Sequence, residues 1–181
     1  MARTVPTLEA QYIYNYPVPT KEGVQVFRFP PDARGGDTYQ VVADVEATAE
    51  ECFKAITDFK IMQETSSVID EIKVIKEDDE GAVIAMRCKP EIDTGVFHYR
   101  YAFDKPNTQM FFWMYDYEGP NRQWYAINVE TRVYQFEKFS RIILTETFVM
   151  MPGVPNADAT GLFTGVGLDM IQRIKNMRAG K

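Results

Sequence analysis

Apolar and polar residues alternate with a period of two through much of this chain, a pattern typical of strands with one buried face. The first clear strand runs from Tyr39 to Ala47 and places Tyr39, Val41, Ala43 and Val45 on one side. Similar segments, each ended by turn residues, follow at 68–76, 82–89, 96–104, 108–117, 122–136 and 141–150. Because short turns join consecutive strands, the pattern predicts an antiparallel meander.

Between the first strand and the meander, the apolar spacing changes to the 3.6-residue period of a helix. Thr48 and Glu51 form a predicted capping box, in which each side chain satisfies a free amide at the helix start. The helix is short, and a second turn over residues 60–65 is expected to continue it at an angle. The apolar face of the first helix carries Ala49, Cys52, Phe53 and Ile56.

The chain closes with one long amphipathic helix, which Asp158 is expected to cap and which extends for about twenty residues, or ~30 Å. Its apolar stripe consists of Leu162, Phe163, Val166, Met170, Ile174 and Met177. Such a stripe must pack on another apolar surface. The predicted fold class is therefore α+β, with a curved antiparallel sheet wrapped around the long C-terminal helix and two short helices after the first strand.

Residues 1–37 precede the main domain, which spans 38–178, and are expected to form an extension that packs on it. Two pieces of the extension alternate in the manner of strands, namely Tyr12, Tyr14 and Tyr16, and then Val24 to Phe29. We expect these pieces to add an edge strand or to wrap the domain.

The order of these elements resembles the START-like superfamily, the helix-grip group that includes polyketide cyclase/dehydrase proteins, plant pollen-allergen proteins and lipid-transfer domains. The resemblance covers roughly residues 38–178. It is carried by the run from Val45 through the capped helix to Asp58-Phe59, and by Gly161-Leu162-Phe163 in the terminal helix. The resemblance implies a cavity between the long helix and the concave sheet that holds a lipid, sterol, polyketide or other apolar ligand. It supplies no universal catalytic motif.

The candidate ligand-binding residues are those expected to face this cavity. They are Met86, Tyr99, Tyr101, Trp113, Glu146, Leu162, Phe163, Val166 and Met170. Glu146 shares a strand face with Ile142, Leu144 and Phe148, so desolvation would raise its pKa if that face points inward. The alternative is an ion pair with Arg87, Arg100 or Arg132 on another strand. No catalytic residue is assigned.

Two strands carry aromatic residues on defined faces. In strand 96–104, Tyr99 and Tyr101 are expected to face inward, which places His98 on the outer face. Strand 108–117 is apolar on both faces, with Phe111, Trp113, Tyr115 and Tyr117 opposing Met110, Phe112 and Met114. Burial on both sides would follow, with the N-terminal extension or a second subunit of a homodimer covering the outer side. Strand 122–136 cannot be oriented from its pattern.

The net charge of −6 argues against nucleic-acid binding and against docking on anionic membranes, because both need a basic surface. No segment is apolar enough for a membrane span, and the first residues lack the layout of a secretory signal. A cytoplasmic location is expected, or an exported one if a signal was removed. Cys52 and Cys88 are expected to be buried free thiols, and the single His98 argues against a multi-histidine metal centre. No cofactor is expected.

The aromatic content of 13% is compatible with the wall of a cavity for a bulky apolar guest, or simply with strand propensity. The leading function is binding or transport of a hydrophobic small molecule. One alternative is a polyketide cyclase/aromatase-like enzyme that uses acid/base residues such as Glu146, Tyr99 or Tyr101. Another is a protein-interaction module whose working surface is the aromatic strand face.

Overall fold

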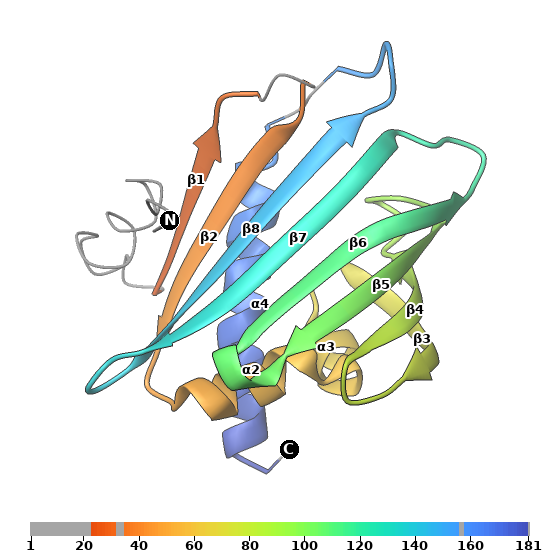
Figure 1. The fold of residues 1–181 in the computed structure, drawn as a ribbon. Coiled ribbons are helices and arrows are strands. Elements are labelled where there is room, and N and C mark those ends of the chain that lie inside the picture. The colour runs from red at the N-terminus through yellow and green to blue at the C-terminus, as the bar shows by residue number, and fades with distance from the viewer. Residues whose placement is uncertain (1–22, 32–34, 156–157, 181) are drawn as a thin grey trace, which may run out of the picture.

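The computed structural model describes residues 23–31, 35–155 and 158–180, which form one eight-stranded antiparallel sheet curved around a long helix (Figure 1). The strand order is β1-β2-β8-β7-β6-β5-β4-β3, so β3 to β8 form the predicted meander and β2 pairs with β8. The strands are β1 (Val24–Phe29), β2 (Asp37–Val45), β3 (Ile69–Glu77), β4 (Gly81–Cys88), β5 (Val96–Asp104), β6 (Gln109–Glu118), β7 (Trp124–Gln135) and β8 (Ser140–Met150).

Two short helices, α2 (Ala49–Thr57) and α3 (Phe59–Thr65), follow the first strand of the main domain, as predicted. The capping box is present, because Glu51 N donates to Thr48 Oγ1 at 3.2 Å and Thr48 N donates to Glu51 Oε2 at 2.8 Å. Asp58 separates the two helices and accepts from Ile61 N at 3.0 Å, so one residue ends α2 and caps α3. A 3₁₀ turn, η1 (Lys105–Asn107), connects β5 to β6.

The long helix α4 (Thr160–Arg178) begins one residue later than an Asp158 cap would place it. Its N-cap is Ala159, whose backbone N–H donates to the Tyr39 hydroxyl at 3.0 Å. Asp158 instead forms a local turn, in which its carboxylate accepts from Thr160 N at 2.9 Å. The Tyr39 hydroxyl of β2 therefore binds the N-cap residue itself, and no side chain among the described residues caps the first turn of α4.

Helix α4 packs mainly against β1, β2, α2 and α3 rather than over the centre of the sheet. Gly167 allows the close approach, because a Cβ built there would lie 2.5 Å from Val24 Cγ1 and 2.8 Å from Val41 Cγ1. Near the helix start, the Phe163 ring stacks on Tyr39 with centroids 4.6 Å apart. This one-sided support leaves room between the helix and the central strands.

Strand β1 comes from the N-terminal extension and forms an edge of the sheet by pairing with β2. The expectation that the extension covers the outer face of β6 is wrong for this piece, because three strands, β2, β8 and β7, lie between β1 and β6 in the sheet. Phe111, Trp113 and Tyr115 on that face are about 40% exposed. Tyr12, Tyr14 and Tyr16 lie outside the described residues. The 1–37 and 38–178 division, and a second subunit on this face, stay predictions.

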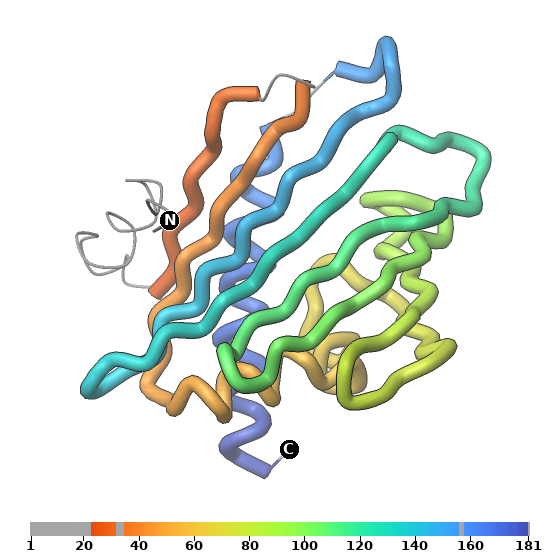
Figure 2. The backbone as a smooth tube through the Cα atoms, viewed as in Figure 1, coloured from red at the N-terminus to blue at the C-terminus, as the bar shows by residue number. Residues whose placement is uncertain are grey.

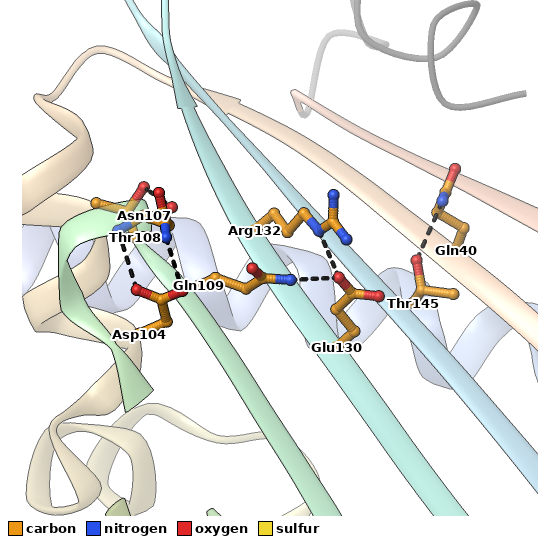
Figure 3. Close-up of polar contacts among 8 residues, drawn as sticks. All are labelled: Gln40, Asp104, Asn107, Thr108, Gln109, Glu130, Arg132 and Thr145. Carbon is orange, nitrogen blue, oxygen red and sulfur yellow. Dashed lines mark hydrogen bonds and ion pairs between the residues drawn. The ribbon is translucent and has the colours of Figure 1, made fainter. Parts of the chain in front are cut away.

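Side-chain hydrogen bonds on the rest of the outer face connect neighbouring strands (Figure 3). Gln40 of β2 donates to Thr145 of β8 at 3.1 Å. Glu130 of β7 accepts from Gln109 of β6 and pairs with Arg132. The side chains in these contacts point outward. Because successive side chains of a strand point to opposite faces, the side chains of the neighbouring residues point inward.

Two irregularities, one in β6 and one in β7, reverse that alternation in the wall of the sheet nearest its centre. Between β5 and β6 the register shifts so that Tyr99 faces Met114 while His98 faces Asp116, which leaves Tyr115 as an extra residue. A second shift lies in β7, between Trp124 and Ala126. Strands β6 and β7 pair only from Gln109 to Trp113, and beyond that point they separate (Figure 2).

Candidate functional site

A cavity of about 310 Å³ lies between α4 and the concave face of the sheet. Its volume is at the lower end of the range of ligand sites, about 300 to 1,000 Å³. The wall combines aliphatic, sulfur-containing and aromatic side chains with a few polar groups. The apolar part includes Ile56, Met62, Val68, Met86, Phe97, Met110, Phe112, Trp124, Ile127, Leu144, Phe148 and Met150.

Eight of the nine candidate residues from the sequence line this cavity: Met86, Tyr99, Tyr101, Glu146, Leu162, Phe163, Val166 and Met170. Trp113 does not, and its inward placement was wrong. In β6 the inward positions are Met110, Phe112 and Met114, so Trp113 points outward and is 38% exposed. Tyr117, predicted on the same face as Trp113, is buried because the extra residue at Tyr115 reverses the alternation.

An aromatic cluster forms the wall beside β5 and β6. Tyr101 stacks on Phe112 with centroids 4.5 Å apart and meets Phe59 of α3 edge-on at 5.0 Å. Tyr99 meets Phe112 edge-on at 5.5 Å. Burial raises the pKa of both tyrosines, so their hydroxyls stay protonated at neutral pH and can donate hydrogen bonds into the cavity. His98, as expected, lies on the outer face, 3.1 Å from Glu118.

Glu146 brings a carboxyl group into the cavity from β8. Burial alone raises its pKa to about 7. The predicted alternative of an arginine pair is not found: among the described residues Glu146 makes no hydrogen bond or ion pair. Arg87 pairs with Glu71 and Arg132 with Glu130, while the Arg100 guanidinium lies over the Tyr115 ring on the outer face.

Arg173 of α4 is a cavity residue that the sequence reasoning missed. It is only 6% exposed, and its Nε donates to Thr65 Oγ1 of α3 at 3.3 Å. The sequence pattern could have indicated this position. Arg173 stands three residues after Met170 and seven after Val166, so it lies in the middle of the apolar stripe of the helix.

Further polar groups reach the cavity singly. Thr131 is 1% exposed, and its hydroxyl has no hydrogen-bond partner among the described residues. The Cys88 thiol is free, as predicted, and burial raises its pKa to about 12. Asp169 lies at the rim, where its carboxylate accepts from Ser67 N at 2.6 Å and from Ser67 Oγ at 2.8 Å.

A buried hydrogen-bond pair holds the loop between β4 and β5, whose Ile92 lines the cavity. Asp93 accepts from the Tyr117 hydroxyl at 2.8 Å and from Gly95 N at 2.6 Å. Gly95 leaves the space that the Tyr117 ring fills, because a Cβ there would lie 2.2 Å from the phenol oxygen. The loop is therefore tied to the end of β6.

Neither a metal site nor a membrane span is found in the described part of the chain. No group of three or more His, Cys, Asp or Glu residues is arranged there to hold a metal ion. None of the helices within those ranges is both long and apolar enough to cross a membrane.

No protein-family model and no curated protein matches this chain. Solved structures do match. The Zhui aromatase/cyclase from Streptomyces sp. R1128 has a TM-score of 0.63 at 11% identity, over 81% of this chain and 96% of that protein. A START superfamily protein from Mycobacterium smegmatis has a TM-score of 0.60 at 12% identity, over 78% of this chain and 95% of that protein. Ara h 8.0201 has a TM-score of 0.61 at 13% identity, over 88% of this chain and 100% of that protein. This chain therefore has the START-like, helix-grip fold.

Proposed function

We propose that the protein binds a hydrophobic small molecule in the cavity under α4 and carries or senses it. The observation that supports this is the cavity itself, which is lined mainly by apolar side chains and holds few polar groups. Sites of this kind bind ligands by apolar burial and orient them with a small number of hydrogen-bonding groups. A carrier needs nothing more, and neither a metal nor a nucleophile–base pair is required.

The test combines native mass spectrometry of the purified protein with uptake of the neutral fluorescent probe 1-aminoanthracene. We expect a co-purified apolar molecule or saturable probe uptake. Val166→Trp should reduce uptake because Val166 lines the cavity, whereas Gln172→Trp, at an exposed position on the same helix, should not. Uptake that is absent, or equal in both variants, would contradict the proposal.

One observation favours a second candidate, an acid/base enzyme acting on a polyketide-like substrate. Glu146 has a pKa of about 7 and sits in the same cavity as the Tyr99 hydroxyl, so it can take up or release a proton near neutral pH. Turnover of a poly-β-ketone mimic that Glu146→Gln abolishes, with probe uptake intact, would establish the enzyme. Binding without turnover would leave the carrier.

A further inference from the structure

Arg173 is a buried cation without a matching anion. Arg173 is 6% exposed to solvent, and its one hydrogen bond goes from Nε to the neutral Thr65 hydroxyl. Neither terminal nitrogen has a hydrogen-bond or ion-pair partner among the described residues, and the side chain lines the cavity. Burying a guanidinium is costly unless a carboxylate or phosphate oxygen takes its hydrogen bonds.

Asp169, the carboxylate whose charge acts on the pKa of Arg173, does not serve as that partner. Asp169, one turn earlier on α4, accepts two hydrogen bonds from Ser67 and makes no ion pair with Arg173. Its charge and the Tyr101 phenol act on the pKa of Arg173, but burial outweighs them and lowers that pKa to about 10. Arg173 therefore stays protonated at neutral pH while its terminal nitrogens remain open to the cavity.

Glu146 does not neutralise Arg173, because neither of the two charges acts on the pKa of the other group. Tyr101, the strand residue whose phenol interacts with Arg173, is in register with Phe112, then Val129, then Glu146. Three interstrand steps separate Tyr101 from Glu146, which is ~14 Å at the backbone. The cavity thus has a cationic end at Arg173, a protonatable carboxyl at Glu146 and aromatic or aliphatic wall between them.

We propose that the ligand is an amphipathic anion, whose single oxyanion head binds the Arg173 guanidinium and whose apolar body lies along the wall toward Glu146. The inference rests on the proposed binding function and deepens it. The planar guanidinium fork matches a carboxylate or a phosphate in two parallel hydrogen bonds, and the Tyr101 hydroxyl can donate a third. An uncharged head of the same length would leave the buried cation unpartnered.

The test measures displacement of 1-aminoanthracene by three ligands with the same chain, namely decanoate, decyl phosphate and decan-1-ol. We expect the wild type to bind at least one of the two anions about tenfold to a hundredfold more tightly than decan-1-ol, the effect of one or two charge-assisted hydrogen bonds. Which anion is preferred identifies the head group as a carboxylate or a phosphate.

Arg173→Met should remove this preference while keeping the affinity for decan-1-ol. Lys175→Met is the matched control, since it deletes an exposed cation from the same helix and should leave the preference unchanged. If Arg173→Met does not fold, Arg173→Lys keeps the charge without the fork and should reduce the preference. The wild-type comparison needs no variant at all.

Two failures can be told apart. If neither the probe nor any of the three ligands binds, the proposed binding function is wrong. If decan-1-ol binds the wild type as tightly as both anions, the cavity binds apolar molecules and the anion inference alone is overturned. The same conclusion follows if Arg173→Met folds and retains the anion preference.

Discussion

Single residues in the cavity are held in protonation states that their surroundings dictate. Glu146 has an ordinary pKa of 4.5 and a folded value of about 7, with burial as the cause. The folded state therefore favours the protonated carboxyl more than the unfolded chain does. The stability that this provides is full below pH 4.5 and is lost as pH rises through about 7.

We expect Glu146→Gln, which imitates the protonated form, to stabilise the protein in a pH-dependent way. The gain should be near zero below pH 4.5 and should rise to at most about 3 kcal/mol above pH 7. Urea denaturation at several pH values measures it. Glu137→Gln, at the exposed turn between β7 and β8, is the control and should change the curve little. A gain that does not vary with pH would show that the carboxyl is solvated.

The loop beside the cavity depends on a single phenol. Tyr117→Phe should destabilise the fold by about 1–3 kcal/mol, because the buried Asp93 carboxylate would lose one of its two donors. Thermal unfolding measures the change. Tyr115→Phe, at an exposed neighbour, should be neutral. Equal melting temperatures for the two variants would mean that water replaces the lost hydroxyl.

Residue-level prediction from the sequence succeeded where a polar side chain interrupts a strand of regular alternation. Glu146 was found in this way, and it lines the cavity. Arg173 interrupts the helical stripe in the same manner, but a long cation on a surface helix commonly carries its charge to solvent. Only the tertiary contacts of α3 and α4 show that this one is enclosed.

At the scale of elements, the glycines of α4 have different roles, which their positions in the sequence do not reveal. A side chain at Gly161 would meet nothing within 4 Å, whereas one at Gly167 would collide with Val24 and Val41. The first glycine weakens the helix without a packing reason. The second seats the helix on β1 and β2.

Alanine substitutions should therefore have opposite effects. Gly161→Ala should raise the stability by up to about 1 kcal/mol through helix propensity. Gly167→Ala should lower it by about 1–3 kcal/mol, because α4 or β1 must move to admit the methyl group. Chemical denaturation of the two variants gives both values. If Gly167→Ala instead raised the free energy of unfolding, β1 would be shown to move aside at little cost in stability.

Every strand and helix that the structure describes was located from the sequence to within about two residues, because turns, capping box and periodicity agree with one another. Facing was wrong or undecided where a strand gains an extra residue. One such shift buried Tyr117, which was expected on the same face as Trp113, and another made β7 impossible to orient. Trp113 lies before the first shift, opposite Arg100 of β5 on the outer face. Extra residues of this kind carry no local sequence signal when both strand faces are apolar.

On the scale of the whole molecule, the cavity follows from the way α4 is supported. The edge strand from the N-terminal extension, together with β2, draws the helix to one side of the sheet, so the concave face of the remaining strands is only partly filled. Leu162 marks where this space meets solvent, because it lines the cavity and is also 40% exposed. Pro155 and Ala159 line the same end.

We therefore expect ligand to pass at the first turns of α4. Leu162→Trp should slow release of 1-aminoanthracene severalfold by narrowing the opening, with a smaller effect on equilibrium affinity, because a barrier at the mouth hinders association and dissociation together. Leu168→Trp is a close control, since Leu168 is also 40% exposed on α4 but does not line the cavity. Stopped-flow dilution measures the release rates. If the two variants release the probe at the same rate, the opening lies elsewhere, and the separation of β6 from β7, beside the cavity residue Trp124, becomes the next place to obstruct.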